Sequence, residues 1–411
     1  MKQIPIAKPS LGTAEAHAAS EAVLSGWVTQ GPRVKAFEEA FAVAVGAPHA
    51  CAVSSCTAAL HLALLAAGVH SGDVVITVSH SFIATANAVR YCGAEPVFVE
   101  IDAGTLNMDP ADLERCLSED FELRGGNLWY RQIERLATSH SPLRQCAGPL
   151  GRLAAIQVVH QLGMPADLKR ILDVAHRFAV PVIEDAACAI GSEITFDGRT
   201  WERIGKPHGV IACFSFHPRK VITTGDGGML TTNNSSYDAE FRLLRHHGMS
   251  MSDLDRHHSE DVIFEHYEIT GFNYRMTDIQ AAIGNSQLGR LETLIAERRG
   301  LARAYQDELA GVRTVSCPLE PEYARSNWQT FIVRLEAGQD QKRVMQNLKS
   351  RGINTRRGVM CAHLEPAYAD AWPKGSLPKS ETAQARGLAL PLYPGMGLDE
   401  VLRVAAALRA V

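Results

Sequence analysis

The chain has no long apolar run and no strong excess of charge of either sign. Its 411 residues carry a formal net charge of −4, which gives no global field for nucleic acid or an anionic membrane. No apolar run reaches membrane-spanning length, and the N-terminal residues 1–9 lack a continuous apolar stretch. We therefore expect a cytoplasmic protein with neither nucleic acid nor a membrane as partner.

The sequence also lacks cysteine pairs and ordered metal-ligand spacing. Its nine cysteines are scattered singly through apolar segments, which favours buried free thiols in a reducing compartment over a disulfide framework. Two histidine pairs, His246-His247 and His257-His258, lie in a polar stretch without the ligand spacing of known metal sites. We expect no metal.

What is present is an alternation of short apolar strands with helices. From Asp73 onward the pattern predicts strands at Val74–Val78, Pro96–Ile101, Leu153–Val159, Val180–Glu184 and Val210–Phe216, and helices at Phe82–Tyr91, Pro110–Leu117 and Ala166–Phe178. Strands joined by helical crossovers predict a mostly parallel α/β sheet with helices on both faces. Residues 118–150 interrupt the alternation, and we interpret them as an inserted excursion with little structure of its own.

The two ends of the chain complete the predicted organisation. Residues 13–46 predict two helices around a turn, and a short strand at Ala50–Val53 leads into a buried helix that ends near Ala67. Near Gly271 a long helix begins, with Thr277 or Asp278 as its cap. The isolated strands and helices beyond it indicate a smaller C-terminal α+β domain. We therefore expect a large domain over 1–250 and a connecting helix with the small domain over 251–411.

Two ionisable side chains follow strands of the predicted sheet. Asp185 comes directly after Val180–Glu184, and Lys220 follows the strand that ends at Phe216. Ligands of such sheets bind beyond the carboxyl ends of the strands, so the acid and the amine could address two ends of one ligand. A lysine whose pKa is lowered by burial or a nearby cation forms imines with aldehydes. The alternative is a structural ion pair that involves Asp185 and Lys220 or a nearby arginine.

A second candidate site lies at the start of the helix after Ala50–Val53. Ser54, Ser55 and Thr57 are side chains typical of helix caps. Free backbone N–H groups and hydroxyls at the positive end of a helix also form a seat for phosphate. The sequence leaves both interpretations open.

Four motifs in this order resemble the sugar aminotransferases of the DegT/DnrJ/EryC1/StrS family. They are Ser54-Ser-Cys-Thr-Ala-Ala-Leu60, Glu184-Asp-Ala-Ala187, Ser215-Phe-His-Pro-Arg-Lys220 with the following glycine cluster, and Gly271-Phe-Asn-Tyr-Arg-Met-Thr277. The resemblance extends from Gly26 to Tyr368. It implies fold type I of the enzymes that depend on pyridoxal 5′-phosphate, with pyridoxamine 5′-phosphate as the intermediate form.

The resemblance implies roles for individual residues. Lys220 would hold the cofactor as an imine and act as catalytic base and acid, and Asp185 would keep the pyridine nitrogen protonated. The remaining cofactor-binding positions that it implies are Ser55, Cys56, Thr57 and Ser215 around the phosphate, Phe82 stacked on the ring, Cys188, and Asn273, together with Arg275, from a second subunit. It thereby implies a homodimer with shared sites.

The chain departs from the family pattern at three places. Cys56 stands where the family usually has glycine, and Cys188 stands where it usually has glutamine or histidine in contact with the ring hydroxyl. A thiol donates only weakly, so Cys188 is either a cofactor contact or a small buried apolar group. The excursion at 118–150 replaces a short connection, and its aromatic and basic residues Trp129, Tyr130 and Arg131 predict that it covers the acceptor site.

The implied reaction is a ping-pong amino transfer. An amino acid, L-glutamate or L-glutamine, would donate to a keto-sugar attached to a nucleotide. Arg356, Arg357 and His363 loosely match the family's approach to the acceptor. The alternatives are a transaminase of a cyclitol or other natural-product ketone, a sugar dehydratase that uses the same cofactor, and a regulatory homologue without activity. Lys220 argues against the dehydratase, because the dehydratases that this chain resembles have histidine at the position of Lys220.

Overall fold

A seven-stranded sheet forms the centre of the larger part of the molecule in the computed structural model, which describes residues 3–250 and 264–410. In spatial order its strands are β1 (His49–Val53), β11 (Gly228–Thr232), β10 (Ile211–Ser215), β7 (Val182–Asp185), β6 (Leu153–Val159), β2 (Val74–Val78) and β3 (Glu95–Val99). The strands from β10 to β3 run parallel, and β11 is antiparallel to both neighbours. The mostly parallel sheet predicted from the alternation is confirmed.

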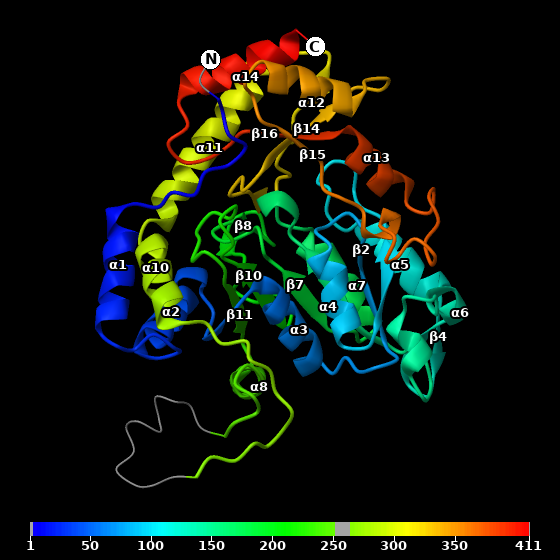
Figure 1. Cartoon of the computed structure of the whole chain (residues 1–411). Coiled ribbons are helices and arrows are strands. Elements are labelled where there is room, and N and C mark those ends of the chain that lie inside the picture. The colour runs from blue at the N-terminus through cyan, green and yellow to red at the C-terminus, as the bar shows by residue number, and fades with distance from the viewer. Residues whose placement is uncertain (1–2, 251–263, 411) are drawn as a thin grey trace.

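Helices cover both faces of this sheet (Figure 1). Successive strand residues point to opposite faces, so Ala212 and Phe214 of β10 enter one core whereas Ile211 and Cys213 enter the other. The first core takes in α2 (Pro32–Val45), α5 (Pro110–Glu119) and α7 (Leu168–Arg177), and the second takes in α3 (Cys56–Ala66), α4 (Ala84–Tyr91) and α8 (Ser235–Leu244). Burial on both faces explains the continuous apolar runs of these strands.

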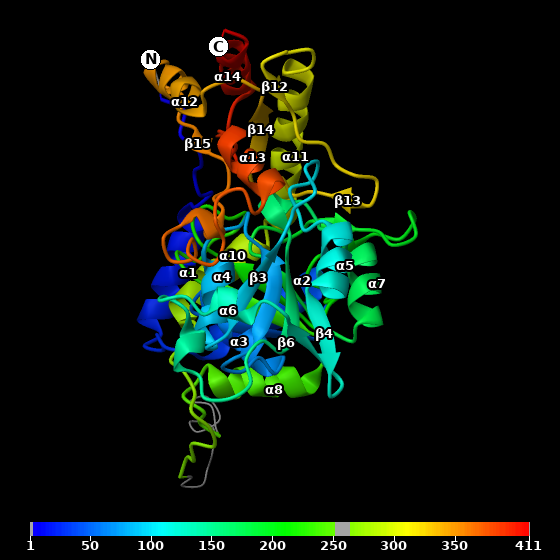
Figure 2. The same cartoon turned by 90° about the vertical axis from the view of Figure 1, so that its right-hand side faces the viewer.

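A second sheet lies in the C-terminal part, above the large one in the views of Figures 1 and 2. Its antiparallel strands are, in order, β12 (Val315–Ser316), β14 (Phe331–Leu335), β16 (Gly387–Leu390) and β15 (Arg356–Arg357). The helices α11 (Leu291–Glu308), α12 (Gln341–Ser350) and α14 (Leu398–Arg409) belong to the same part of the chain. A core of its own lies beneath them.

The connection between the large sheet and the C-terminal part begins with a helix that has a side-chain cap at its N-terminus. Thr277 is the cap of α10 (Asp278–Leu288), because its hydroxyl accepts a hydrogen bond from the Gln280 amide at 3.2 Å. The predicted long helix is interrupted after Leu288 and continues as α11. α10 packs against α2 and α1 (Thr13–Leu24) of the N-terminal part. The domain boundary near residue 250 stays a prediction.

Residues 118–150 have more structure than we expected. β4 (Phe121–Arg124) and β5 (Asn127–Tyr130) form a hairpin, followed by α6 (Ile133–Leu136). Gly125 and Gly126 have φ of 56° and 83°, as a two-residue hairpin turn requires. The sequence signal for this hairpin is Gly125-Gly126 between two four-residue segments of residues that favour strands, 121–124 and 127–130. Our interpretation did not use it.

The remaining elements are short. They are β8 (Glu193–Ile194), β9 (Glu202–Arg203) and β13 (Ala324–Arg325), which form a three-stranded sheet, the 3₁₀ helices η1 (Pro142–Gln145), η2 (Gln161–Gly163) and η3 (Ala362–Leu364), and α13 (Pro378–Arg386). All nine cysteines are free, and six of them are buried. Within residues 3–250 and 264–410, no helix is long and apolar enough to cross a bilayer.

Candidate active site

A cavity of about 810 Å³ opens where β7 and β10 end, between the large sheet and β15 and β16 of the small one. Because parallel neighbours present their carboxyl ends at the same edge, the loops after these two strands meet there. The predicted site residues that line the cavity are Ser55, Cys56, Thr57, Phe82, Asp185, Cys188, Ser215, Lys220 and Arg356.

Lys220 lies on a turn after β10 and reaches the cavity floor half-buried. Its backbone N–H donates to the carbonyl of His217 at 2.8 Å, and its Nζ lies 3.0 Å from Cys188 Sγ. Burial by itself would lower the pKa of Lys220, but the neighbouring Cys188, Cys56 and Asp185 raise this pKa above its ordinary value. The pKa of Lys220 therefore lies above its ordinary value, and the lowering by burial alone does not prevail.

Asp185 ends β7 and is only 3% exposed. Its carboxylate accepts hydrogen bonds from Thr85 Oγ1 at 2.9 Å and from the Ala187 N–H at 3.2 Å. Burial raises the pKa of Asp185 above its ordinary value, while Thr85 and Ala187 oppose the shift. No ion pair joins Asp185 to a cation among the residues that the structure describes. A buried carboxylate of this kind favours a cationic N–H donor in the cavity.

The first turn of α3 lies beside these two residues. Ser55 caps the helix, with its side chain accepting from the Ala58 N–H at 3.1 Å. The next two N–H groups, of Cys56 and Thr57, have no intrahelical acceptor in a first turn. The Thr57 hydroxyl has no hydrogen-bond partner within the described ranges. Ser55 is thus the helix cap, and its contact with a phosphate stays a prediction. The turn after Ser55 offers donors to an anion.

A glycine allows this turn to lie against the sheet. A Cβ on Gly228 of β11 would meet the Ser55 carbonyl at 2.5 Å and the Cys56 nitrogen at 2.7 Å. The glycine cluster after Lys220 therefore allows the start of β11 to approach the start of α3 closely. Cys56 itself is accommodated, since its side chain is 8% exposed within the second core.

These features fit pyridoxal phosphate. Phe82 is 63% exposed at the cavity wall, which leaves a ring face free for stacking. The first turn of α3 suits a phosphate group. The buried Asp185 suits a protonated ring nitrogen, and Lys220 supplies the amine.

Three predicted residues, His363, Asn273 and Arg275, do not line the cavity. His363 is buried, its Nδ1 lies 2.6 Å from Ser79 Oγ, and its Nε2 lies 3.2 Å from Glu381 Oε1. His363 therefore lies outside the cavity, because η3 is pressed against the end of β2, and its contact with substrate stays a prediction. Asn273 is exposed on the segment that precedes α10, outside the cavity.

The excursion at 118–150 does not cover the cavity either. Trp129 pairs with Arg152 at the start of β6, and the Trp129 indole N–H donates to the Arg124 carbonyl. This is the amino end of a strand whose carboxyl end, at Val159, faces the cavity. The prediction is wrong because the hairpin contacts the amino end of β6, opposite the carboxyl end that lines the cavity.

Sequence reasoning missed several residues that line the cavity. They are Thr85, His160, Gln161, His217, Arg219 and Gln329. Thr85 lies three residues after Phe82, so helical spacing could have indicated it. Arg219 precedes Lys220 directly in the same motif, and its position next to the lysine could have indicated it.

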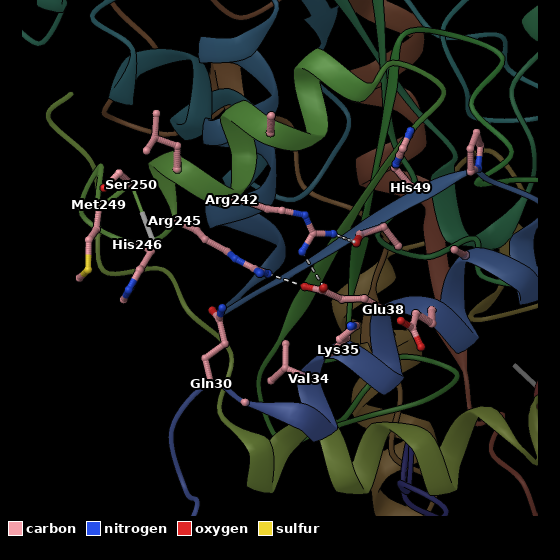
Figure 3. Close-up of a pocket in the computed structure, with 17 residues that line it drawn as sticks. Gln30, Val34, Lys35, Glu38, His49, Arg242, Arg245, His246, Met249 and Ser250 are labelled. Atoms are coloured by element: carbon pink, nitrogen blue, oxygen red, sulfur yellow. Dashed lines mark hydrogen bonds and ion pairs between the residues drawn. The ribbon is translucent and has the colours of Figure 1, made fainter. Parts of the chain in front are cut away.

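A second cavity, of about 490 Å³, lies between α2 and α8 (Figure 3). Glu38 accepts hydrogen bonds from Arg242 at 2.8 Å, from Arg245 and from the Ala52 N–H at 2.8 Å. Burial would raise the pKa of Glu38, but the two guanidinium groups hold it below its ordinary range. This network is structural, because it joins α8 to α2 and β1.

The histidine stretch gives no metal site where it can be described. His246 Nδ1 lies 2.6 Å from Arg275 Nη1, while His257 and His258 lie outside the described residues. In residues 3–250 and 264–410, no three His, Cys, Asp or Glu side chains are grouped to hold a metal ion.

Comparison with known proteins decides the family. The sequence profile described as the DegT/DnrJ/EryC1/StrS aminotransferase family matches residues 9–409. The chain belongs to this family. Aminotransferases of the family use pyridoxal phosphate, so the family, the fold and the cofactor expected from the motifs are confirmed.

Solved structures of similar chains support the assignment. TlmJ, an aminotransferase from Streptoalloteichus hindustanus, is 31% identical, with 99% of this chain and 98% of that chain covered and a TM-score of 0.81. DesV of S. venezuelae, solved in complex with a ketimine intermediate, is 29% identical over 100% and 98% of the two chains, with a TM-score of 0.84. DesI, solved in the presence of its TDP-sugar product, is 28% identical over 100% and 93%, with a TM-score of 0.79.

Proposed function

We propose that this aminotransferase moves an amino group from an amino acid, L-glutamate or L-glutamine, to a keto-sugar carried on a nucleotide. The observation that carries the proposal is the meeting of Lys220 and Asp185 in one cavity, beside the first turn of α3 and the free face of Phe82. Pyridoxal phosphate supplies, when bound, an electrophilic carbon and a ring that accepts electrons.

The residues of the chain have separate tasks in this reaction. Lys220 Nζ takes the proton from the α-carbon of the donor and returns it later, as base and then acid. Asp185, oriented by Thr85 and the Ala187 N–H, would hold the ring nitrogen of the bound cofactor in its protonated form. The backbone N–H groups of Cys56 and Thr57 would donate hydrogen bonds to the oxygens of the cofactor's phosphate.

Basic side chains at the rim favour an acceptor that carries phosphate. Arg219, Arg356 and Arg357 all line the cavity and are exposed. Arg357 Nη2 lies 3.8 Å from Glu365 Oε1, whereas no ion pair of Arg219 or Arg356 occurs in the described ranges. Guanidinium groups recognise phosphate in bidentate geometry. The TDP-sugar product of the similar protein DesI supports the same acceptor class.

A second subunit completes the proposed site. Asn273 and Arg275 lie on the segment before α10, where the family resemblance assigns residues that reach the phosphate of a partner. Asn273 is exposed, as such a contact requires. We therefore propose a homodimer with shared sites.

Two spectroscopic steps test the proposal. L-glutamate added to the purified yellow protein should bleach its visible band, and a keto-sugar nucleotide should restore it. Borohydride reduction of the protein before the donor is added should fix the cofactor's mass on Lys220 in peptide mapping. A band that no amino acid bleaches, or a mass fixed on another residue, would overturn the proposal. Bleaching with recovery only by a cyclitol ketone would replace the acceptor class.

A further inference from the structure

The floor of the cavity pairs an amine with a thiol. Cys188 lies three residues after β7 and Lys220 five residues after β10, and these strands are parallel neighbours. Lys220 Nζ donates to Cys188 Sγ at 3.0 Å, and both side chains line the cavity. Within the described ranges, Cys188 is the only cysteine whose sulfur is hydrogen-bonded to a lysine.

The backbone of Cys188 is fixed from behind by Asn327. The fully buried Asn327 Nδ2 donates to the carbonyls of Cys188 and Ile190, each at 2.8 Å. The Asn327 N–H donates in turn to Ser192 Oγ at 3.0 Å. The loop is therefore held from the side away from the cavity, which directs the sulfur toward the amine.

We propose that Cys188 is a positioning residue for Lys220, holding its free amine at the cavity floor and exchanging a proton with it. This inference rests on the proposed function, in which Lys220 is released from the cofactor when the amino-acid donor binds to it. The free amine of Lys220 must then carry protons. A thiol is ordinarily a stronger acid than an alkylammonium group. The S–H bond therefore breaks as the N–H bond forms, giving a thiolate beside an ammonium, and the reverse step restores the neutral amine that can act as base.

The pair should be detectable in the full-length protein freed of its cofactor. o-Phthalaldehyde condenses with an amine and a thiol that lie together and yields a fluorescent isoindole. We expect the cofactor-free wild type to become fluorescent and the holoenzyme, whose Lys220 is occupied, to react much less. Cys188→Ala and Lys220→Ala should abolish the signal. Fluorescence that survives Cys188→Ala, or none from the wild type, would overturn the proposal.

Two other half-buried cysteines provide matched controls. Cys146 contacts Ser71 Oγ at 2.9 Å, and Cys317 lies near β12, both outside the cavity. Cys146→Ser and Cys317→Ser should leave the isoindole signal and the donor reaction unchanged. Loss of the signal in either control would assign the thiol elsewhere and reject the pair.

Alkylation rates measure the proton exchange. With iodoacetamide, Cys188 of the cofactor-free protein should react about tenfold faster than in Lys220→Met, because the ammonium stabilises the thiolate. Peptide mass spectrometry separates Cys188 from the other cysteines. Equal rates in the two proteins would show that no proton is shared.

Kinetics separate positioning from a packing role. Cys188→Ser keeps a hydrogen-bond partner without an ionisable thiol, and Cys188→Ala removes both. We expect kcat of the donor half-reaction to fall about tenfold in Cys188→Ala with KM unchanged, and its pH profile to shift in Cys188→Ser. Unchanged pH profiles would reject the exchange. If borohydride still fixes the cofactor on Lys220 and L-glutamate still bleaches it, the proposed function stands without this inference.

Discussion

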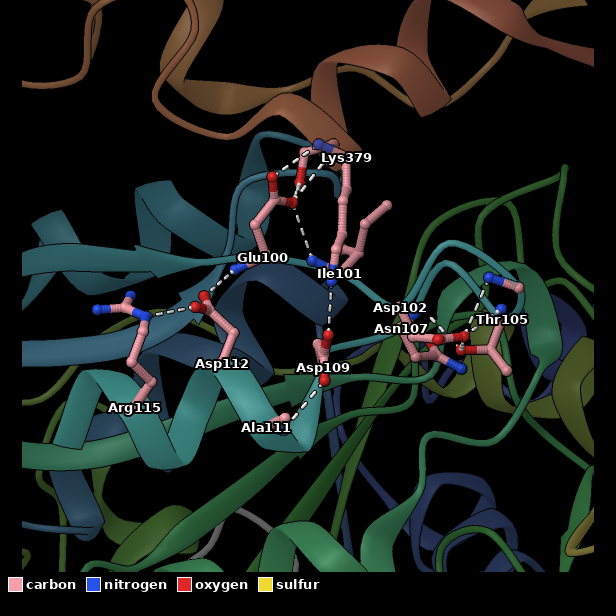
Figure 4. A network of polar contacts seen from close by, with 12 residues as sticks. Glu100, Ile101, Asp102, Thr105, Asn107, Asp109, Ala111, Asp112, Arg115 and Lys379 are labelled. Atoms are coloured by element: carbon pink, nitrogen blue, oxygen red, sulfur yellow. Dashed lines mark hydrogen bonds and ion pairs between the residues drawn. The ribbon is translucent and has the colours of Figure 1, made fainter. Parts of the chain in front are cut away.

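The carboxyl edge of the large sheet has two halves that treat polar side chains in opposite ways. At the end of β2, Ser79 is bonded to His363, and just after β3, Glu100 accepts from the backbone N–H groups of Lys379 and Ser380 at 2.7 and 3.0 Å (Figure 4). At the ends of β7 and β10, Asp185 and Lys220 face a cavity instead. The same edge is closed in one half and open in the other.

The closing segment comes from far along the chain. Residues 361–386 pack into the first core of the large sheet through Tyr368, Trp372 and Leu377. Arg90 lies over the Tyr368 ring at 3.8 Å from its centroid, and the Tyr368 hydroxyl donates to Asn87. A strand end thus predicts a place for a ligand only where no other segment of the chain occupies it.

The largest effect should come from removing the amine of the open half. Lys220→Ala should slow the donor half-reaction by at least about 10³-fold, since proton transfer by a placed side chain contributes 10²–10⁴-fold. Stopped-flow bleaching of the visible band with L-glutamate measures it. Thermal unfolding should change little, because Lys220 is no part of a packed core. A variant that retains normal bleaching would move the chemistry away from this edge.

The acid of the open half should follow. Asp185→Asn keeps the size of the side chain but removes the charge that holds the ring nitrogen protonated, so we expect about a hundredfold loss in kcat. Thr85→Val is the matched control, because it removes only the 2.9 Å hydrogen bond to Asp185. It should cost about tenfold or less. A larger loss in Thr85→Val than in Asp185→Asn would contradict the assigned roles.

A substitution in the closed half should lower the stability of the protein and change its turnover hardly at all. His363→Ala removes the bonds to Ser79 and Glu381 and leaves a cavity, and we expect a cost of about 2–4 kcal/mol in the free energy of unfolding. Urea denaturation measures this cost. The acceptor KM should stay within about twofold, since His363 does not line the cavity. A large rise in acceptor KM without loss of stability would restore the substrate contact first expected for His363.

The comparison also explains what the sequence could predict. Strand and helix periodicity is local, so it placed Asp185 and Lys220 at strand ends, and parallel pairing then brought them together. Gly228 was recognisable as part of a glycine cluster. The need for glycine there, however, comes from its close approach to Ser55, which is a tertiary contact that the local sequence does not show. The burial of His363 could not be predicted, because it depends on a contact with Ser79, 284 positions away.

The smallest effect that we expect is a pH dependence of stability in the closed half of the sheet edge, which the open half should not share. Burial holds the pKa of His363 below its ordinary 6.5, against the raising influence of Glu381 and Glu100. The unfolded chain then binds the proton more readily, so the stability that neutral His363 contributes is full above pH 6.5 and is lost as pH falls toward the folded pKa.

His363→Asn keeps an acceptor for Ser79 but does not titrate. Melting temperatures between pH 7 and 5 should therefore fall more steeply in the wild type than in His363→Asn. The cofactor's band at Lys220 should show the same pH dependence in both proteins, because the open half does not depend on this histidine. Parallel melting curves would mean that His363 is already charged against Glu381 in the folded protein.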